Sequence, residues 1–507
     1  METILETKHI YKSFVGVQAL KDINIKINKG EIHCFAGENG CGKSTLIKNI
    51  SGVYTPDSGE IILNGKKYQK ITTKQAMDEG VQVIYQDLSL FPHLTVAENI
   101  AIGKIQNSKK TIINWKEIYQ IAEEQLRKIG VSIDLHLKVS ELSIANKQIV
   151  AICRALAQNA KLLFMDEPTT ALTKKEVDRL LEIMVDLKKR GMAIVFISHK
   201  LDEVFSVADM ITIFRNGEKI GDYKSDELDK KSLSYYMTGR EVDYPKYIRT
   251  VKDDNVILEV DNLTRQGQYE QISFQVRKGD IIGLIGRLGA GRTELALSLF
   301  GLNPVSSGTI KIEGKEVVIN SPQKAKECNI ALLPEDRFTQ GLFMDREIKQ
   351  NISSAVLPEI SNKGIDLKKE VEIANQYIEQ LKVRTPSCET VVGTLSGGNQ
   401  QKVVIGKWLA TSPKIFIMDN PTVGIDIGAK AEIYEQIHHF ANKGMSVIFI
   451  SDEIPEILAN CNKILVLSEG KQIAYFDEND LETEDMLLEE KIKNLLNDEK
   501  KEEQDEK

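Results

Sequence analysis

The chain has 507 residues, too many for a single hydrophobic core, so two or more domains are expected. Lysine and arginine total 66 against 74 aspartates and glutamates, and the formal charge of −8 provides no general attraction to nucleic acid or anionic lipid. No apolar run approaches the roughly 18 residues of a membrane span, no N-terminal signal is expected, and the six cysteines form no CxxC pair, as in a reduced, cytosolic protein.

The first motif in the chain is a phosphate-binding loop that follows an apolar strand pattern at Ile32–Ala36. Its glycines let backbone N–H groups approach phosphate oxygens, and the following helix adds positive potential at its N-terminus. Lys43 is expected to reach the β- and γ-phosphates of a nucleotide, and Ser44 to ligate Mg²⁺. Cys41 lies near the helix N-terminus, which could lower its pKa, but we favour the simpler interpretation of a small loop residue. The predicted loop comprises Gly37, Glu38, Asn39, Gly40, Cys41, Gly42, Lys43, Ser44 and Thr45.

Two further side chains are candidates for the same nucleotide. Phe14, or else Tyr11, could stack on adenine, although either could belong to the core. Gln86 offers an oxygen for metal or water and an amide that can shift with conformation, whereas a lone glutamine would ordinarily be a surface residue.

A helical pattern and a weakened motif come next. Apolar residues from Trp115 to Ile129 recur at helical spacing, which predicts a helical subdomain inserted into the domain. Ser143 then opens the sequence Ser-Ile-Ala-Asn-Lys-Gln. The segment that begins at Ser396 reads Ser-Gly-Gly-Asn-Gln, so the earlier copy has lost its glycines.

The apolar run Leu162–Asp166 ends in two acids. Asp166 is placed to hold Mg²⁺ directly or through water, and Glu167 to orient and deprotonate the attacking water. An acidic pair that only caps the next helix is the alternative. His199, after a strand pattern at Ala193–Ser198, is expected to contact the γ-phosphate, although a lone histidine there would ordinarily be structural.

The whole pattern then repeats. Lys43 and Arg292 are 249 positions apart (292 − 43), and Asp166 and Asp419 are 253 apart (419 − 166), so the chain contains two copies of one α/β domain. We expect domains at residues 1–240 and 255–495, a linker at 241–254 and a charged tail at 496–507, of which residues 498–507 are expected to be disordered. The second copy has its own strand patterns at Ile281–Ile285, Ile415–Asp419 and Ser446–Ser451, and a helical pattern from Val371 to Leu381.

The second copy has changed the residues that carry the chemistry. Its loop, from Gly286 to Thr293, has Arg292 in place of lysine. Asn420 replaces the general base, Asp452 stands where the histidine is expected and would repel phosphate, and Glu335 replaces the glutamine. The candidate binding residues of this copy are Gly286, Gly289, Gly291, Arg292 and Thr293, together with the intact segment Ser396, Gly397, Gly398 and Asn399.

These motifs and spacings resemble the nucleotide-binding domains of ABC transporters. The resemblance implies two tandem P-loop NTPase domains that pack head to tail and bind ATP with Mg²⁺, each nucleotide lying between the phosphate loop of one domain and the signature segment of the other. Site one then combines Lys43, Ser44, Gln86, Asp166, Glu167 and His199 with Ser396-Gly397-Gly398, all intact. Site two combines Arg292, Thr293, Asp419, Asn420 and Asp452 with the weakened segment at Ser143. We therefore expect one hydrolytic site and one that binds ATP weakly or statically.

Within that family the chain is similar to the fused ATPase subunits of bacterial monosaccharide importers of the ribose and galactose type. The loop with Arg292, the Pro334-Glu335-Asp336-Arg337 segment and Leu395–Lys402 carry this likeness. It implies a peripheral protein on the cytoplasmic face of the membrane that docks on two permease subunits, with an extracytoplasmic binding protein that delivers the solute. Relatives of this type usually have glutamate at the position of Asn420. This departure strengthens the expectation that the two nucleotide sites differ in hydrolysis.

Three other functions stay open. A nucleoside or signal-molecule importer would share the same architecture. A soluble fused ABC ATPase acting on ribosomes or nucleic acid is disfavoured by the short junction, the single intact site and the negative charge. An ATP-gated structural clamp would require Glu167 to be dispensable.

Overall fold

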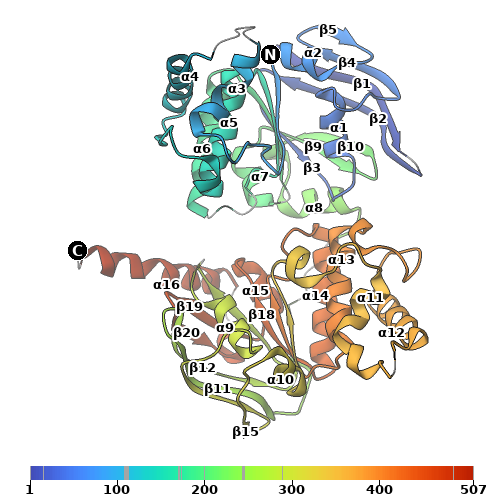
Figure 1. Ribbon diagram of the computed structural model, residues 1–507, viewed down its shortest axis with the longest axis vertical. Helices are drawn as coiled ribbons and strands as arrows, with labels where there is room; N and C mark the ends of the chain where they lie inside the picture. Colours follow the sequence, from blue (N-terminus) through green and yellow to red (C-terminus); the bar gives the residue numbers. More distant parts are fainter. Residues whose placement is uncertain are drawn as a thin grey trace. The chain divides into compact units, whose positions relative to one another are not determined.

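The computed structural model describes residues 2–14, 16–107, 113–169, 172, 174–198, 200–241, 246–287, 289–362, 364–482 and 485–505. The chain divides into two compact units, Met1–Val242 and Asp243–Lys507, which we call unit 1 and unit 2 (Figure 1). Both are α/β, as the sequence predicts.

Unit 1 is built on a six-stranded sheet with the order β10-β9-β3-β8-β7-β6. All neighbours in this sheet are parallel except β10. The strands β3, β7 and β8 are apolar runs because both faces are buried, one of them against α1 and strands of a second sheet. A separate antiparallel sheet has the order β2-β1-β4-β5. The strands are β1 (Thr3–Phe14), β2 (Val17–Asn28), β3 (Ile32–Ala36), β4 (Ser58–Leu63), β5 (Lys66–Tyr68), β6 (Val81–Ile84), β7 (Leu162–Asp166), β8 (Ala193–Ile197), β9 (Met210–Arg215) and β10 (Glu218–Lys224).

The helices of unit 1 include the predicted inserted subdomain, in which α3 packs on α4 and α5. Helix α4 begins at the cap Asn114 and buries one face, with Ile118, Ile121 and Leu126 pointing inward. The helices are α1 (Lys43–Ile50), α2 (Thr73–Asp78), α3 (Val96–Asn107), α4 (Trp115–Lys128), η1 (Val139–Glu141), α5 (Ile144–Ala157), α6 (Lys174–Lys189), α7 (Leu201–Val207), η2 (Ser225–Glu227) and α8 (Lys230–Thr238).

Unit 2 repeats this plan in one continuous ten-stranded sheet with the order β15-β14-β11-β12-β20-β19-β13-β18-β17-β16. A single pairing between Glu270 of β12 and Lys471 of β20 joins the antiparallel part to the parallel core. The strands are β11 (Val256–Arg265), β12 (Tyr269–Arg277), β13 (Ile281–Gly286), β14 (Ser307–Ile312), β15 (Lys315–Glu316), β16 (Ile330–Leu333), β17 (Ile415–Asp419), β18 (Ser446–Ile450), β19 (Lys463–Ser468) and β20 (Lys471–Phe476).

The helical subdomain of unit 2 consists of α11 packed on α12 and α13, and Figure 1 shows these helices together beside α14. The helices are α9 (Arg292–Leu299), α10 (Pro322–Glu327), η3 (Arg337–Gly341), α11 (Ile348–Ser353), η4 (Ser354–Glu359), α12 (Leu367–Gln380), η5 (Val392–Thr394), α13 (Gly397–Leu409), α14 (Ile427–Asn442), α15 (Ile454–Asn460), η6 (Glu478–Glu482) and α16 (Asp485–Asp505).

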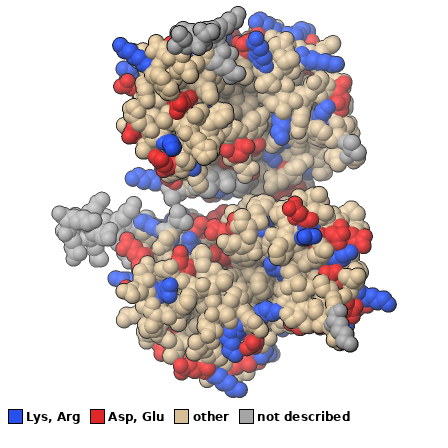
Figure 2. All heavy atoms as spheres, in the orientation of Figure 1, with Lys and Arg blue, Asp and Glu red and all other residues tan. Residues whose placement is uncertain are grey.

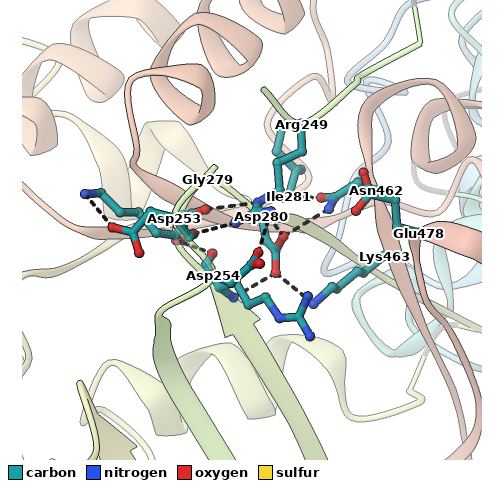
Figure 3. A network of polar contacts seen from close by, with 12 residues as sticks. Arg249, Asp253, Asp254, Gly279, Asp280, Ile281, Asn462, Lys463 and Glu478 are labelled. Carbon is teal, nitrogen blue, oxygen red and sulfur yellow. Dashed lines mark hydrogen bonds and ion pairs between the residues drawn. The ribbon is translucent and has the colours of Figure 1, made fainter. Parts of the chain in front are cut away.

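Residues 246–254, which the sequence assigns to a linker, lie against unit 2. Tyr247 is 4 % exposed and its hydroxyl donates to a backbone carbonyl between β12 and β13 at 2.7 Å. Arg249 Nε lies 3.3 Å from Oδ1 of Asp280, a carboxylate that is 1 % exposed and also pairs with Lys463 at 2.9 Å. Figure 3 shows these side chains converging on Asp280. The segment is therefore anchored by buried charge to the second unit; its function as a linker stays a prediction.

The C-terminal segment differs from the expected disordered tail, because helix α16 continues to Asp505. Leu488 and Ile492 of this helix are buried in the core of unit 2. They anchor its first turns, and extending a formed helix costs far less than starting one, which accounts for a helix in a highly charged sequence.

The surface of each unit carries both signs of charge, as the face in Figure 2 shows. Within the part of the chain that the structure describes, no helix has the length and apolarity needed to cross a bilayer.

Candidate functional site

The first phosphate loop lies between β3 and α1, at the carboxyl end of a central strand. Gly37 has φ of +150° and Gly42 has φ of +105°. A Cβ atom at Gly37 would lie 2.3 Å from the Phe214 carbonyl oxygen, and one at Gly42 would lie 2.5 Å from the Ala19 carbonyl oxygen. These two positions therefore require glycine, and the loop closes tightly over the strand end. Asn39, Gly40 and Ser44 stay exposed on its outer side.

The loop lysine is buried, and the hydrogen bonds that it forms with described residues go to uncharged groups. Lys43 Nζ donates to the carbonyl oxygens of Gly37 at 2.7 Å and Glu38 at 2.8 Å, and lies 3.5 Å from Cys41 Sγ. Carbonyl oxygens hold an ammonium group less strongly than anionic oxygens do, so a phosphate can replace them.

Cys41 is 4 % exposed, and burial raises the pKa of its thiol despite the nearby Lys43. This favours the interpretation of Cys41 as a small packing residue rather than a reactive thiolate.

The acidic pair lies beside the loop. Ser44 Oγ donates to Asp166 Oδ2 at 3.2 Å, so the two expected Mg²⁺ ligands are already in contact. Burial raises the pKa of Asp166, and the neighbouring Glu167 raises it further. Glu167 follows directly with φ of 47°, and its N–H donates to the carbonyl oxygen of Ile197 at 3.1 Å. This backbone bond holds the residue in a strained conformation at the strand end, which is common at functional sites.

The remaining candidates of unit 1 are placed less directly. Ile84 of β6 pairs with Met165 of β7, so Gln86 comes level with Glu167 at the carboxyl edge, where it is exposed. Phe14 is 43 % exposed and packs edge-on against Tyr54, with ring centroids 5.3 Å apart, which leaves ring surface for a base. The sequence did not reveal Tyr54. His199 lies outside the described residues, and Thr45 follows Ser44 in α1.

The second loop has the same backbone plan but a different partner for its cation. Gly291 has φ of +88°, and a Cβ atom at Gly286 would lie 2.4 Å from a backbone oxygen of β19. Arg292 is 6 % exposed; it donates to the Ser451 carbonyl oxygen at 3.0 Å and forms an ion pair with Asp452. Asp452, at the position expected for histidine, therefore holds the loop cation with a carboxylate. Sequence reasoning predicted only that Asp452 would repel phosphate.

At the end of β17, Asp419 has the same contact as Asp166 in unit 1, but the residue that follows it is an amide, Asn420, in place of the general base. Thr293 Oγ1 donates to Asp419 Oδ2 at 2.8 Å, as Ser44 does to Asp166. Burial raises the pKa of Asp419 to about 6, and Glu335 contributes. Asn420 has φ of 45°, close to that of Glu167, but its side-chain amide donates to Glu335 Oε1 at 3.2 Å. An amide cannot accept a proton from water at neutral pH.

The two signature segments also diverge. Ser396 caps α13, and the Asn399 amide donates to Ser396 Oγ at 2.9 Å. Gly397 and Gly398 leave the N-terminus of this helix without side chains, which suits the binding of an anion. Ser143 caps α5 in unit 1, but the next residue is Ile144, 48 % exposed, which places an apolar side chain at that terminus.

Each unit also braces its strand ends through a buried glutamate that the sequence analysis missed. Glu203 accepts hydrogen bonds from Thr169 at 2.6 Å and Ser198 at 3.1 Å. Glu456, 253 positions later, accepts them from Thr422 and Ser451. The offset between the copies is the signal that would have found the pair.

Known proteins resemble this chain over most of its length. The model of the ABC transporter family matches residues 20–170 and 269–423. The ribose import ATP-binding protein RbsA of Bacillus licheniformis is 40% identical over 479 residues, which cover 94% of this chain and 97% of that protein. A protein of Pseudomonas syringae pv. tomato, named for ribose, galactose and methyl galactoside import, is 40% identical over 96% of this chain and 92% of its own.

Among solved structures, a nucleotide-free ATP-binding cassette from an ABC transporter is 26% identical, with a TM-score of 0.42, and covers 47% of this chain and 96% of its own.

Proposed function

The chain belongs to the ABC transporter family and is an ATP-binding, ATP-hydrolysing subunit of a transport system, and from this we propose that it energises the import of a simple sugar through a membrane permease. The names of the relatives, which specify ribose, galactose and methyl galactoside, support the cargo class.

We further propose that only one of the two nucleotide sites hydrolyses ATP. One observation carries this proposal: the residues that follow β7 and β17 have nearly the same backbone conformation, with φ of 47° at Glu167 and 45° at Asn420. The first position offers a carboxylate that can act as general base, and the second an amide that cannot. The ion pair of Arg292 with Asp452 supports the same conclusion, because nucleotide would have to displace a carboxylate there.

The proposed site one takes the signature segment Ser396-Gly397-Gly398 from unit 2, as in the head-to-tail arrangement that the family implies. In it, Lys43 binds the β- and γ-phosphates, Glu167 takes the proton of the attacking water, and Phe14 stacks on adenine. The bare N-terminus of α13 stabilises charge on the γ-phosphate.

The residues also fit a Mg²⁺ ion. Ser44 and Asp166 offer two oxygen ligands 3.2 Å apart, a small set that suits an ion whose remaining ligands are phosphate and water. Gln86, level with Glu167, would add a third. The ion would supply charge neutralisation at the phosphates.

The proposed partners are two integral-membrane permease subunits, supplied with solute by an extracytoplasmic binding protein, and the proposed location is the cytoplasmic face of the membrane. The import function named for the relatives supports this assignment. Gln86 and Glu335 follow equivalent strands of the two units, and we propose that the surfaces around them transmit ATP-driven motion to the permease.

The test uses two matched variants. Glu167→Gln should abolish uptake of one solute from a labelled panel of ribose, galactose, glucose, xylose, arabinose and a nucleoside, and should lower the ATPase rate of purified protein roughly 10²–10⁴-fold. Asn420→Ala should lower the rate less than about threefold. Equal losses would refute the asymmetric assignment, and loss of nucleoside uptake alone would replace sugar as the cargo.

A further inference from the structure

Arg337 is a buried arginine that joins three segments of unit 2. It follows β16 and is 8 % exposed. One terminal nitrogen donates to the Val423 carbonyl oxygen at 2.8 Å, and the other donates to the Gly424 carbonyl oxygen at 3.2 Å. Its Nε lies 3.5 Å from the side-chain oxygen of Gln400 on α13. One guanidinium group therefore links the segment after β16, the segment after β17 and the helix that begins at the signature.

The surroundings of Arg337 fit this side chain closely. A Cβ atom at Gly397 would lie 2.9 Å from Arg337 Nη2 and 3.1 Å from the Gly424 carbonyl oxygen, so a side chain at this position would crowd the guanidinium and one of its acceptors. Asp336 accepts hydrogen bonds from the backbone N–H groups of Phe338 and Thr339, at 2.8 and 3.3 Å. The Phe338 ring centroid lies 4.6 Å from the guanidinium carbon. The backbone and one face of the arginine are thus both held in place.

The sequence of unit 1 does not contain this arginine–glycine pair. The offset of 249 that relates Lys43 to Arg292 also relates Leu88 to Arg337 (337 − 88), and Ile144 corresponds to Gly397 in the signature. The carbonyl oxygen of Leu88 instead accepts a hydrogen bond from Arg154 of α5 at 3.0 Å. The arginine–glycine pair in unit 2 is replaced by a leucine and an isoleucine in unit 1. The link is therefore found in the unit with the intact signature segment.

We propose that Arg337 is a positioning residue for ATP hydrolysis at site one. It holds the start of α13 and the Val423–Gly424 segment in one fixed relation, so that the Ser396-Gly397-Gly398 segment meets the γ-phosphate of ATP bound by unit 1. A planar guanidinium binds two carbonyl oxygens in a defined geometry, which a lysine cannot reproduce. This inference rests on the proposed function, since it requires the signature of unit 2 to serve the nucleotide of unit 1.

The experiment compares Arg337→Met and Arg337→Lys with the parent in the full-length protein. Methionine keeps most of the side-chain length and removes every donor. In the Glu167→Gln background, Arg337→Met should weaken the equilibrium affinity for ATP about tenfold and leave that for ADP unchanged, because the signature contacts only the γ-phosphate. With Glu167 present, the same change should lower kcat about tenfold, and Arg337→Lys should recover part of the loss.

Arg384→Met is the matched control, because the Arg384 side chain is 78% exposed and pairs with Glu432 on the surface. It should leave both nucleotide affinities unchanged. Equal weakening of ATP and ADP by Arg337→Met, or a normal kcat per folded molecule with only a lower melting temperature, would overturn the positioning role. Failure of the proposed function is seen separately: substantial ATPase activity in Glu167→Gln would refute it whatever the Arg337 variants do.

Discussion

Unit 1 and unit 2 place a cation at the same point of the same loop, yet the cations have different partners. Lys43 donates to two backbone carbonyl oxygens, at 2.7 and 2.8 Å. Arg292 pairs with the Asp452 carboxylate and donates to the carbonyl oxygen of Ser451, the residue that follows β18. The first arrangement leaves the charge available to a phosphate, whereas the second neutralises it within the protein. The comparison shows that the phosphate loop can keep its backbone geometry even where its cation forms an ion pair with a carboxylate of the protein.

The buried glutamates extend this contrast. Glu456 accepts a hydrogen bond from Lys430 at 2.8 Å and one from Tyr434, whereas Glu203 in unit 1 forms an ion pair with Lys200 at 3.4 Å. The offset of 253 places Val177 and Leu181 of unit 1 at the positions of Lys430 and Tyr434. The charged partner of the buried glutamate therefore comes from a different place in each unit: Lys200 lies directly before α7 in unit 1, and Lys430 lies on α14 in unit 2.

The largest expected difference between the units is in the loss of ATPase rate when the cation of each phosphate loop is replaced. Lys43→Met should reduce the ATPase rate roughly 10²–10³-fold, because it removes the charge that stabilises the transferring phosphoryl group. Arg292→Met should reduce it less than about threefold, since that cation is already paired with Asp452. Steady-state phosphate release by the purified variants measures both. Similar losses in the two variants would mean that unit 2 also turns over.

The buried acid Asp419 should oppose folding at neutral pH. Its pKa is raised from 3.8 to about 6, chiefly by burial, so between about pH 4 and 6 the folded protein binds this proton more tightly than the unfolded chain. The cost of burying the carboxylate is complete above pH 6 and absent below pH 4. Asp419→Asn should therefore raise the free energy of unfolding by on the order of 3 kcal/mol at pH 8.

Urea denaturation at pH 8 and pH 4.5 would measure this gain, which should shrink at the lower pH. Asp166→Asn in unit 1 is the control and should gain less, because Asp166 is more exposed than Asp419. A gain that is equal at the two pH values would contradict the titration of Asp419 as its source.

The smallest expected effect is the gain in ATP affinity at the second site when the ion pair between Arg292 and Asp452 is removed. Asp452→Asn removes the carboxylate partner and should strengthen ATP binding at the second site about tenfold, corresponding to ~1.4 kcal/mol. Equilibrium binding in the Glu167→Gln background should then approach two ATP molecules per chain. Glu453→Gln, a neighbouring acid whose side chain is 55% exposed, should not change the stoichiometry. An unchanged stoichiometry in Asp452→Asn would show that Asp452 does not control this site.

Local features of the sequence predicted most of the fold. The expected strands at Ile32–Ala36, Leu162–Asp166 and Ile415–Asp419 are observed with these bounds, and β13 extends one residue further than expected, to Gly286. Such strands can be recognised in the sequence because a strand buried on both faces must be apolar throughout. The helix at 496–505 was missed because its charged sequence resembles a disordered tail, while the buried anchors Leu488 and Ile492 lie before it.

The sequence by itself determined the duplication, the two loops and the replacement of Glu167 by Asn420, because each depends on residue types at short, fixed spacings. Only the tertiary structure decided which groups meet across long separations. It pairs Arg292 with Asp452, 160 positions away, Arg249 with Asp280, and Arg337 with the carbonyl oxygens of Val423 and Gly424. Long flexible side chains have many acceptors within reach, and only the folded backbone determines which of them lies at hydrogen-bonding distance.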